Sequence, residues 1–419
     1  MTALAYFILL AEFLFACFLL YSDGLLTVKS SSFMLVFALL MGFGARLLCL
    51  EHRSMDYLMF LSGWMSEIHA GGGFSSLSGQ IGNYNIPYMT LLSLFSYCRT
   101  GDLYLIKLLS IFFDVLLAWA AMKICGLFFN NPRRCGVVFC LVFMLPTVII
   151  NSAYWGQCDS LYVSLALLGV YFALADRPVL SVISIAVSFC FKLQAVFIIP
   201  VFALFLIKGK LRLKHLLIFP LVCAVLILPA VFAGRPFGDA LLSYISQTGS
   251  IGNGYSYGAP SFLSLIQSAQ TVLSQLNTEE TIALVSRIFV VVGFVFVAVV
   301  LCFCFFSRGR IGNYEMLLNF ALFVLCIPYL LPHMHERYFY CADIAAVILA
   351  FVDKRYLYLG VGVEMASLLS YWAYYASNNA LPYIPVYVIA VLLGLMIVVF
   401  VLQYIKGMLK NPLAKGSQM

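Results

Sequence analysis

The chain has 419 residues, of which 64% are hydrophobic and only 10% are charged, and its mean hydropathy is +1.03. These values exclude a soluble globular domain and predict an all-α, polytopic membrane protein. The net charge of +7 would also fit a nucleic-acid partner. The basic residues, however, are dispersed over short connectors between apolar runs, which is typical of membrane topology.

Apolar runs recur along the chain from residues 4–20 onward. Runs of about 17 to 25 apolar residues can cross a hydrocarbon core of about 30 Å. The first run has no basic segment before it and no small-residue cleavage site, so it is interpreted as a retained span. No long hydrophilic stretch interrupts the series, and residues 1–419 are therefore predicted to form a single integral membrane domain.

The positions of lysine and arginine predict which loops face the cytoplasm. The basic connectors are residues 130–134, 176–178, 208–215, 307–310, 353–355 and 406–415. For the loops to alternate, residues 179–207 must cross twice with a break near Lys192, and residues 86–97 must not cross. The result is about thirteen spans, within a range of about 11 to 14, with the N-terminus outside and the C-terminus inside.

Residues 51–88 form the first polar outer loop of this topology. Residues 56–70 alternate with a helical period, which predicts a helix lying along the membrane interface. A carboxylate at the edge of a low-dielectric region, such as Asp56, has a raised pKa and suits a general base. Glu51 and Glu67 compete for this role, and an ordinary solvated loop acid is the alternative.

A second polar group, YWGQCDS at residues 154–160, lies where a span is expected to emerge. Trp155, Gln157 and Asp159 provide an aromatic plane, an amide and an acid, which is a common set for binding sugars. Gly156 permits a tight turn and a close backbone approach. Alternatively, Trp155 is an interfacial anchor and Asp159 a helix N-cap.

Lys192 and Gln194 lie in the middle of an apolar run. Two positions apart, they would point to different faces of one helix, which favours a break between them. A lysine inside the membrane costs about 2.5 to 3.5 kcal/mol, so it should pair with an anion or line a wet cavity. Snorkelling of the side chain to the interface is the alternative.

The stretch LLPHMHERYFY, residues 330–340, places four ionisable groups in five positions. A helix is predicted to begin near His333, with His333, Glu336 and Arg337 on one face of its first turns. With His335 nearby, such a cationic helix start suits an anion such as phosphate, and Glu336 would orient Arg337 or a histidine. A solvated helix start with an internal ion pair is the alternative, and the spacing fits a zinc site poorly.

The longest outer loop, residues 234–281, is rich in glycine and tyrosine around residues 252–262. Loops of this length are usually functional or disordered, and the aromatic content argues against disorder. The loop is predicted to be a lid or an acceptor-recognition element. No nucleotide-binding glycine motif is present, and no CxxC pair occurs among the 13 cysteines, so neither disulfides nor a metal cluster is expected.

In this order the motifs resemble the polytopic GT-C glycosyltransferases, in particular bacterial members similar to the second mannosyltransferase of GPI-anchor synthesis. The resemblance covers roughly residues 33–352 and is carried by Asp56 followed by Trp64 and a glycine turn, YNIPY (84–88), WGQCDS (155–160), FKLQ (191–194) followed by Pro200, and PHMHERY (332–338). It implies that Tyr84 and Asn85 also contact substrate. The run at residues 4–22 is extra relative to the family.

The resemblance implies inverting transfer of a hexose, often mannose, from a polyprenyl-phosphate donor to an extracytoplasmic glycan, lipid or protein acceptor. Asp56 would deprotonate the acceptor hydroxyl, while Lys192 and Arg337 would meet the phosphate. The sequence has no DxD pair in this loop, so no divalent metal or other cofactor is expected. A bacterial cytoplasmic membrane with an outward-facing site is the expected location, and an endoplasmic reticulum membrane is the alternative.

The expected partners are the lipid-linked donor, the acceptor and membrane lipid, and no nucleic acid. A transporter or flippase for a lipid-linked saccharide is the alternative function. Alternating access needs polar groups reachable from both sides, often in repeated halves, whereas the cytoplasmic connectors here are short and basic. A scaffold subunit would instead show scattered polar positions. The prediction therefore depends on the polar motifs sharing one pocket.

Overall fold

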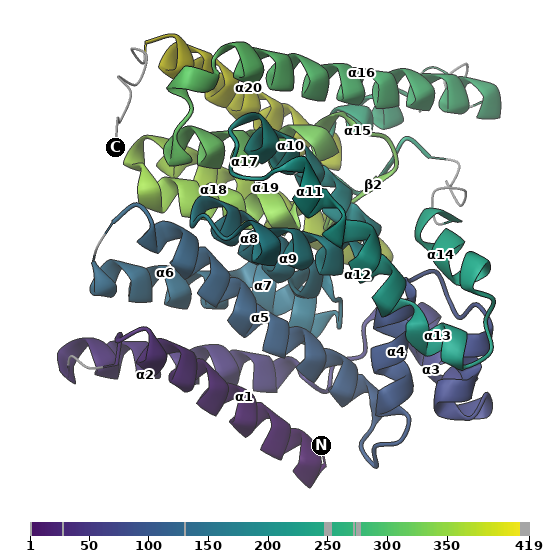
Figure 1. Ribbon diagram of the computed structural model, residues 1–419. Coiled ribbons are helices and arrows are strands. Elements are labelled where there is room, and N and C mark those ends of the chain that lie inside the picture. The colour runs from purple at the N-terminus through teal and green to yellow at the C-terminus, as the bar shows by residue number, and fades with distance from the viewer. Residues whose placement is uncertain are drawn as a thin grey trace. The chain divides into compact units, whose positions relative to one another are not determined.

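The structure is a computed structural model that describes residues 2–26, 29–129, 131–246, 254–270, 273 and 278–410 (Figure 1). Helices dominate these residues, and the strands described are two short ones, β1 (Ser256–Tyr257) and β2 (Met334–His335). The chain divides into two compact units, unit 1 (Met1–Ala195, Leu213–Ser250) and unit 2 (Val196–Arg212, Ile251–Met419). The prediction of an all-α, polytopic membrane fold is confirmed.

Seven helices of the described chain are long and apolar enough to cross a membrane, or eight if one bent pair is a single span. They are Ala3–Ser22, Ser32–Cys49, Asp102–Gly126, Leu213–Phe232, Glu279–Phe306, Asn313–Leu330 and Val386–Leu409, with Pro132–Met144 and Pro146–Tyr154 as the pair, bent by 47°. The sequence predicted about thirteen. Much of the difference comes from apolar helices of only 10–17 residues, which a hydropathy pattern does not separate from full spans.

Unit 1 is built around α5, which runs between neighbouring helices in Figure 1 and packs against α1, α6 and α8. Further contacts join α8 to α9, α9 to α12 and α2 to α6. Its elements are α1 (Ala3–Ser22), α2 (Lys29–Cys49), η1 (Tyr57–Leu61), α3 (Ser62–Ala70), η2 (Gly73–Ser78), α4 (Ile86–Phe95), α5 (Asp102–Gly126), α6 (Pro132–Met144), α7 (Pro146–Ile149), η3 (Ile150–Tyr154), α8 (Asp159–Leu174), α9 (Pro178–Phe191), α11 (Leu213–Leu216), α12 (Ile218–Leu226), α13 (Leu228–Phe232) and α14 (Phe237–Ser246).

A buried ion pair ties four of these elements together. Arg46 on α2 donates from Nε to Asp114 Oδ2 on α5 at 2.9 Å, and from Nη2 to the Phe143 carbonyl on α6 at 2.8 Å. Ser152 on η3 donates to the same carboxylate oxygen. Both charged side chains have no solvent exposure, and a buried charge persists only when it is paired and hydrogen-bonded in this way.

The loop of residues 51–88 contains the helix that the sequence predicted. It begins with the π-helical turn η1 and continues as α3, and Leu58, Met59 and Phe60 on η1 are exposed. The next helix, α4, has 10 residues. At 1.5 Å per residue it is about 15 Å long and too short to cross a core of about 30 Å, in agreement with the prediction for this segment.

The break predicted near Lys192 is confirmed. Helix α9 ends at Phe191, and Lys192 has an extended backbone with φ −150° and ψ 131°. The chain continues as a short 3-10 helix, η4 (Leu193–Ile198), before α10 (Ile199–Ile207). Lys192 therefore lies between two helical segments, in neither of them.

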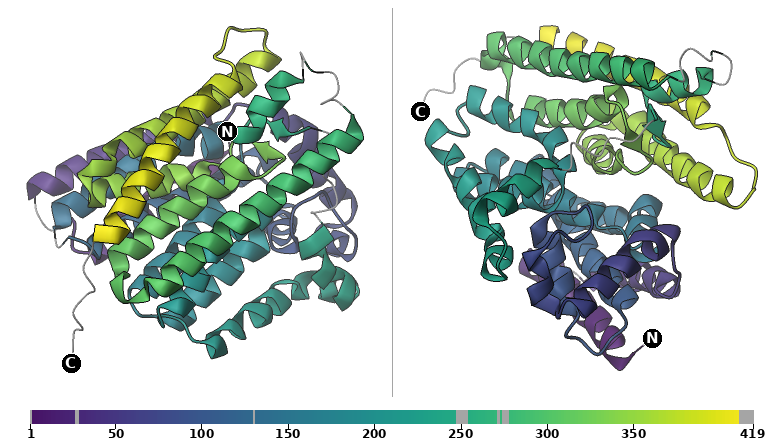
Figure 2. Two further views of the ribbon diagram at one scale, coloured as in Figure 1. Left: turned by 90° about the horizontal axis from the view of Figure 1, so that it is seen from above. Right: turned by 90° about the vertical axis from the view of Figure 1, so that its right-hand side faces the viewer.

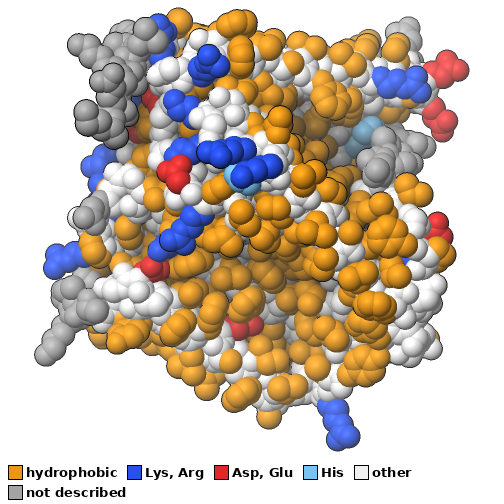
Figure 3. Space-filling model, viewed as in Figure 1, with side chains coloured by type: hydrophobic (Ala, Val, Ile, Leu, Met, Phe, Trp, Pro, Cys, Tyr) orange, Lys and Arg blue, Asp and Glu red, His pale blue; other side chains and the backbone are white. Residues whose placement is uncertain are grey.

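Unit 2 contains α16, α17 and α20 running alongside one another (Figures 1 and 2). Its elements are α10, β1, α15 (Phe262–Ala269), α16 (Glu279–Phe306), η7 (Arg308–Arg310), α17 (Asn313–Leu330), β2, α18 (Tyr340–Val352), η8 (Lys354–Tyr356), α19 (Leu357–Asn378) and α20 (Val386–Lys410). Helix α17 is buried along most of its length, whereas many large hydrophobic side chains of α16 and α20 are exposed. Hydrophobic side chains cover most of the face of each unit that Figure 3 shows, as lipid-facing surfaces require.

The prediction that a helix begins near His333 is wrong. Residues 331–339 are not helical, β2 pairs in parallel with β1, and α18 begins only at Tyr340. His333 has a left-handed backbone with φ 60°. Its N–H donates to the Tyr255 carbonyl at 2.8 Å, so partners about eighty residues away replace those of a helix.

The long loop predicted at residues 234–281 is largely structured where it is described. It contains α14, β1 and α15. Residues 247–253, 271–272 and 274–277, which include part of the glycine and tyrosine segment, lie outside the described residues. Its role as a lid or acceptor-recognition element stays a prediction.

Candidate functional site

Asp56 is joined to two other predicted site residues by a chain of hydrogen bonds. The Gln157 amide donates from Nε2 to Asp56 Oδ2 at 2.5 Å, and the Tyr84 hydroxyl donates to Gln157 Oε1 at 3.1 Å. Gln157 is 5% exposed, whereas Asp56 at the start of η1 is half-buried. The amide thus holds a partly accessible carboxylate in a defined orientation.

A second network contains the cation and the acid that the sequence singled out. The Lys192 ammonium forms a buried ion pair with Asp159 Oδ1, and Asn151 donates from Nδ2 to Asp159 Oδ2 at 2.8 Å. Lys192 and Asp159 are 4% and 1% exposed. Asp159 is the first residue of α8 and not its N-cap. The N-cap alternative is therefore wrong, and Asp159 instead compensates the charge of a buried lysine.

Tyr84 connects the two networks. Its hydroxyl contacts Gln157, and the centre of its ring lies 5.4 Å from the Lys192 ammonium, within cation–π range. The Trp64 ring packs against Tyr84 edge-on, with 5.2 Å between the ring centres. A Cβ on Gly82, which has φ 53°, would come within 2.4 Å of the Trp64 indole. Glycine is thus required where the loop passes the aromatic pair.

The turn before Gln157 is tightly packed. Gly156 has φ 75°, a conformation that favours glycine. The Ser54 hydroxyl donates to the Trp155 carbonyl at 2.6 Å and connects this turn to the loop that carries Asp56. Trp155 is only 5% exposed, whereas Trp64 and Tyr84 are half-buried. The more accessible aromatic faces are therefore those of Trp64 and Tyr84.

Lys107 is a residue of this region that the sequence interpretation missed. Its ammonium donates to the Cys49 carbonyl at 2.8 Å and to the His52 carbonyl at 2.6 Å, at the end of α2. Its side chain also packs 3.6 Å from the position that a Cβ on Gly156 would take. Lys107 thus supports both the loop of Asp56 and the turn of Gln157. No motif marks it, because its hydrogen-bond partners are backbone carbonyls.

The remaining predicted residues of unit 1 lie beside these networks. Asn85 donates from Nδ2 to the Phe189 carbonyl at 3.4 Å and is buried. Gln194 follows the break after α9, and its buried Oε1 has no hydrogen-bond partner among the described residues. Glu67 on α3 is exposed, as is Glu51. Of the three acids considered as bases, Asp56 is the one that accepts a hydrogen bond from the Gln157 amide.

Unit 2 contains the other predicted group. The Tyr257 and His335 rings stack with their centres 5.1 Å apart, and the Tyr338 ring packs against the same histidine at a tilt, with 5.2 Å between the ring centres. Arg337 donates from Nη1 to Glu336 Oε1 at 2.8 Å, and His335 Nδ1 lies 3.8 Å from Glu336 Oε2. The His333 Nδ1 bonds to the Gly254 carbonyl at 2.7 Å. Aromatic faces and a held guanidinium therefore share one short segment.

Two groups of this segment have shifted pKa values. Burial alone would raise the pKa of Glu336, but the neighbouring Arg337 and His335 outweigh it and hold the pKa below its usual range. Burial lowers the pKa of His333, against the opposing effect of its bond to the Gly254 carbonyl. Glu336 is therefore an anion that fixes the Arg337 guanidinium in place.

Within the described parts of the chain, no group of three or more His, Cys, Asp or Glu side chains is arranged to hold a metal ion. The Asp56 carboxylate is directed to the Gln157 amide. An amide that donates to a carboxylate favours its ionised form and fixes its orientation.

A comparison with models of protein families indicates the class of enzyme. Residues 93–208 match the model of the alpha-(1->6)-mannopyranosyltransferase N-terminal domain of the MptA_B family. Residues 93–208 are therefore similar to a mannosyltransferase domain. The match confirms the resemblance to GT-C-type mannosyltransferases and identifies the protein as a membrane hexosyltransferase. The narrower likeness to the GPI-anchor branch stays a prediction, and no curated protein matches the chain.

The matched segment of this mannosyltransferase-type protein covers about a quarter of the chain and lies mostly in unit 1. It includes Lys107, Asn151, Gln157, Asp159 and Lys192. It does not include Asp56, Tyr84 or the segment around Arg337. The contact between Gln157 and Asp56 is one of several that join the matched segment to the loop that precedes it, together with those of Trp155 with Ser54 and of Lys107 with His52.

Proposed function

We propose that the protein transfers a hexose, mannose in the first instance, from a polyprenyl-phosphate sugar to a hydroxyl group of an extracytoplasmic acceptor, with inversion at the anomeric carbon. The observation that carries this proposal is the chain from Tyr84 through Gln157 to Asp56, next to the Lys192–Asp159 ion pair. Asp56 and Lys192 both lie in the unit that contains most of the segment matched by the family model.

Asp56 acts as the general base in this reaction. The acceptor oxygen attacks the anomeric carbon, its proton passes to the Asp56 carboxylate, and the bond between the anomeric carbon and the phosphate oxygen breaks. The Gln157 amide donates to Oδ2 and holds the carboxylate in a fixed orientation. Half-burial of Asp56 allows the acceptor to reach it while excess water is kept away.

The sugar lies against aromatic faces. Trp64 and Tyr84 pack edge to face and are half-buried, so part of each ring can meet the apolar face of a hexose. Asn85 and Gln194 contribute amide groups for sugar hydroxyls. The Gln194 Oε1, which is buried without a hydrogen-bond partner in the described chain, suits a ligand hydroxyl.

The departing polyprenyl phosphate needs positive charge more than a proton donor. A preorganised cation in a water-poor site lowers the barrier by several kcal/mol, about 3 to 4 for a single donor. Lys192 supplies this charge in unit 1, with Asp159 and Asn151 fixing its position. In unit 2, Arg337 held by Glu336, with His333 and His335 beside it, supplies a second cationic group for lipid phosphate.

The test is a transfer assay with the purified full-length protein in liposomes. Polyprenyl-phosphate mannose, polyprenyl-phosphate glucose and a sugar nucleotide are supplied in turn as radiolabelled donors, with membrane extract as acceptor. We expect label to leave the lipid donor and to appear in an α- or β-configuration opposite to that of the donor. Movement of intact labelled lipid across the bilayer without release of sugar would support the flippase alternative and refute the proposal.

A further inference from the structure

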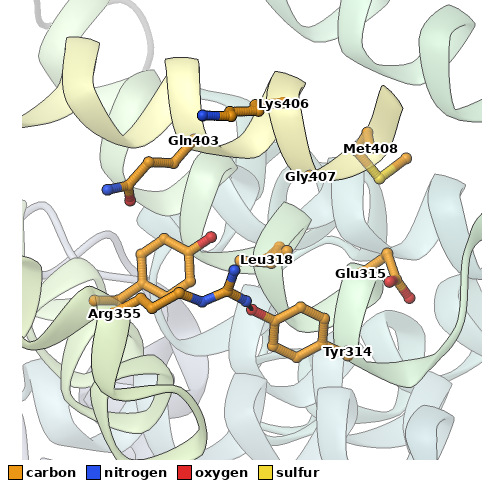
Figure 4. Close-up of a pocket in the computed structure, with 9 residues that line it drawn as sticks. Tyr314, Glu315, Leu318, Arg355, Gln403, Lys406, Gly407 and Met408 are labelled. Atoms are coloured by element: carbon orange, nitrogen blue, oxygen red, sulfur yellow. Dashed lines mark hydrogen bonds between the residues drawn. The ribbon is translucent and has the colours of Figure 1, made fainter. Parts of the chain in front are cut away.

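Unit 2 has a cavity that no part of the transfer reaction uses. It has a volume of about 520 Å³ and is lined by the start of α17, by η8 and by the last turns of α20. Pockets that bind small ligands are typically about 300 to 1,000 Å³. Figure 4 shows Gln403 and Lys406 on α20 across the cavity from Arg355 and Tyr314. The lining combines apolar and polar surface, with two cationic side chains, Arg355 and Lys406, and one buried carboxylate, Glu315, which accepts from the Gly312 N–H at 2.8 Å.

One of the two cations is uncompensated. Arg355 donates to Asp353 through Nε and Nη2 and to the Tyr314 hydroxyl through Nη2 at 3.2 Å, so much of its charge is balanced. Its Nη1 has no hydrogen bond to any described residue. Lys406 is exposed and, among the residues that the structure describes, has neither an ion pair nor a hydrogen bond.

The surrounding end of unit 2 is strongly basic. Helices α10, α16, α18 and α20 end here, and the Lys208 ammonium donates to the Arg308 carbonyl at 3.0 Å. The charged residues described at this end are Lys208, Lys210, Arg212, Arg308, Arg310, Lys354, Arg355 and Lys406, against Asp353 and Glu315. Eight positive and two negative charges give a net charge of +6, which attracts anions.

Apolar surface adjoins the cavity on α20. Leu402 and Leu409, one turn to either side of Lys406, are both 62% exposed. A soluble anion would gain nothing from these leucines, whereas an amphiphile can place its phosphate in the cavity and its acyl chain on the helix. Basic pockets between membrane helices bind anionic lipid headgroups by this combination.

We propose that this cavity binds the phosphate of an anionic phospholipid headgroup, with Lys406 and Arg355 Nη1 as the cationic donors and Gln403 and Tyr314 as hydrogen-bonding walls. The acyl chains lie along the exposed leucines of α20. The site is separate from the residues assigned to sugar transfer and does not depend on that function.

The test is native mass spectrometry of the purified full-length protein released from detergent. The probes are phosphatidylglycerol and phosphatidylcholine with the same acyl chains, and sn-glycerol 1-phosphate as a soluble competitor. Lys406→Gln removes the uncompensated charge. Lys354→Gln is the matched control, because it removes the same charge from an exposed residue next to Arg355 that does not line the cavity.

We expect phosphatidylglycerol to bind in preference to phosphatidylcholine, and Lys406→Gln to weaken that binding about fivefold, the effect of one lysine near an anionic headgroup. Lys406→Arg and Lys354→Gln should bind as the wild type does. Equal binding of the two lipids, or an equal loss in Lys354→Gln and Lys406→Gln, would overturn the proposal. Competition by glycerol phosphate at the concentration of the lipid would assign the cavity to a soluble anion and overturn the lipid assignment.

Discussion

The Gln157 side chain donates a hydrogen bond to the Asp56 carboxylate across 101 residues of sequence. Gln157 stands in the segment matched by the mannosyltransferase model, and Asp56 in the loop before it. This contact helps to fix the orientation of the candidate base. It also gives an acid in a loop, between the end of α2 and η1, a defined position.

Asp56→Asn should abolish transfer while the donor still binds. Asparagine keeps an oxygen that accepts from Gln157, so the loop stays in place, but the amide cannot take up a proton. Loss of a general base typically reduces the rate by about 10²- to 10⁴-fold. Transfer rates and donor binding measured on the same preparation check this. Glu67→Gln, which removes an exposed acid on α3, should leave both unchanged; wild-type turnover by Asp56→Asn would assign the base to another residue.

The ion pair of Lys192 and Asp159 allows structural and catalytic roles to be separated. Lys192→Met leaves a buried carboxylate without its cation, and breaking a buried pair in this way costs about 3 to 5 kcal/mol of folding free energy. The double variant Lys192→Met with Asp159→Asn should recover most of this stability in thermal unfolding. Transfer should remain slow in the double variant, because the cation for the leaving phosphate is still missing. Recovery of both stability and transfer would reduce the pair to a structural role.

Lys107 should act as a positioning residue. Lys107→Met removes the donor to the Cys49 and His52 carbonyls, and we expect kcat to fall, since misplacing a reacting group by about 1 Å costs about 10²-fold. The KM for donor should change little, and Lys107→Arg should restore part of kcat. Lys123→Met is the control, because Lys123 lies on the same helix but pairs with Asp23 at 2.7 Å. An equal fall in kcat for both variants would indicate a general effect on α5.

Arg337→Ala should weaken binding of the lipid donor by about tenfold or more, the loss expected for a hydrogen bond between charged groups. It also leaves Glu336, which is 2% exposed, without its nearest cation. Adding Glu336→Gln should therefore restore thermal stability but not donor binding. Arg287→Ala, an exposed arginine on α16, serves as the control. A donor affinity unchanged in Arg337→Ala would remove this residue from the phosphate site.

The pH dependence of stability should include a contribution from His333. Burial lowers the pKa of this imidazole in the folded state. The unfolded chain then binds more protons than the folded chain below about pH 6.5, the ordinary histidine value, so stability falls as the pH falls through that value. His333→Asn should flatten the decline between pH 7 and pH 5 in thermal unfolding, because asparagine tolerates the left-handed backbone. A decline as steep as that of the wild type would exclude His333 as its source.

Local chemistry in the sequence was enough to predict several features. The break at Lys192 follows from the cost of holding a lysine inside an apolar helix, and the helix after Asp56 follows from its apolar period. Both depend on neighbours within a few residues. The pairing of Gln157 with Asp56 and the insertion of Lys107 under Gly156 depend on which helices pack together, and no local pattern contains that information.

In the stretch after Pro332, the local pattern predicted a structure that the folded chain does not adopt. A helix starting at His333 was a sound local interpretation, since Glu336 and Arg337 follow at helical spacing. The backbone of residues 333–336 instead bonds to residues 255–257. Hydrogen bonds to this distant segment replace those of a helix. The local sequence does not contain this pairing.

The two π-helical turns, η1 directly after Asp56 and η3 directly before Trp155, frame the candidate base and the amide that holds it. Each wide turn accommodates one residue more than a regular helix would. Deleting a residue from either turn would tighten it and rotate everything beyond by about 100°. The number of residues in these two turns therefore determines the direction of the Asp56 and Gln157 side chains. A one-residue deletion would be more harmful to their contact than many substitutions.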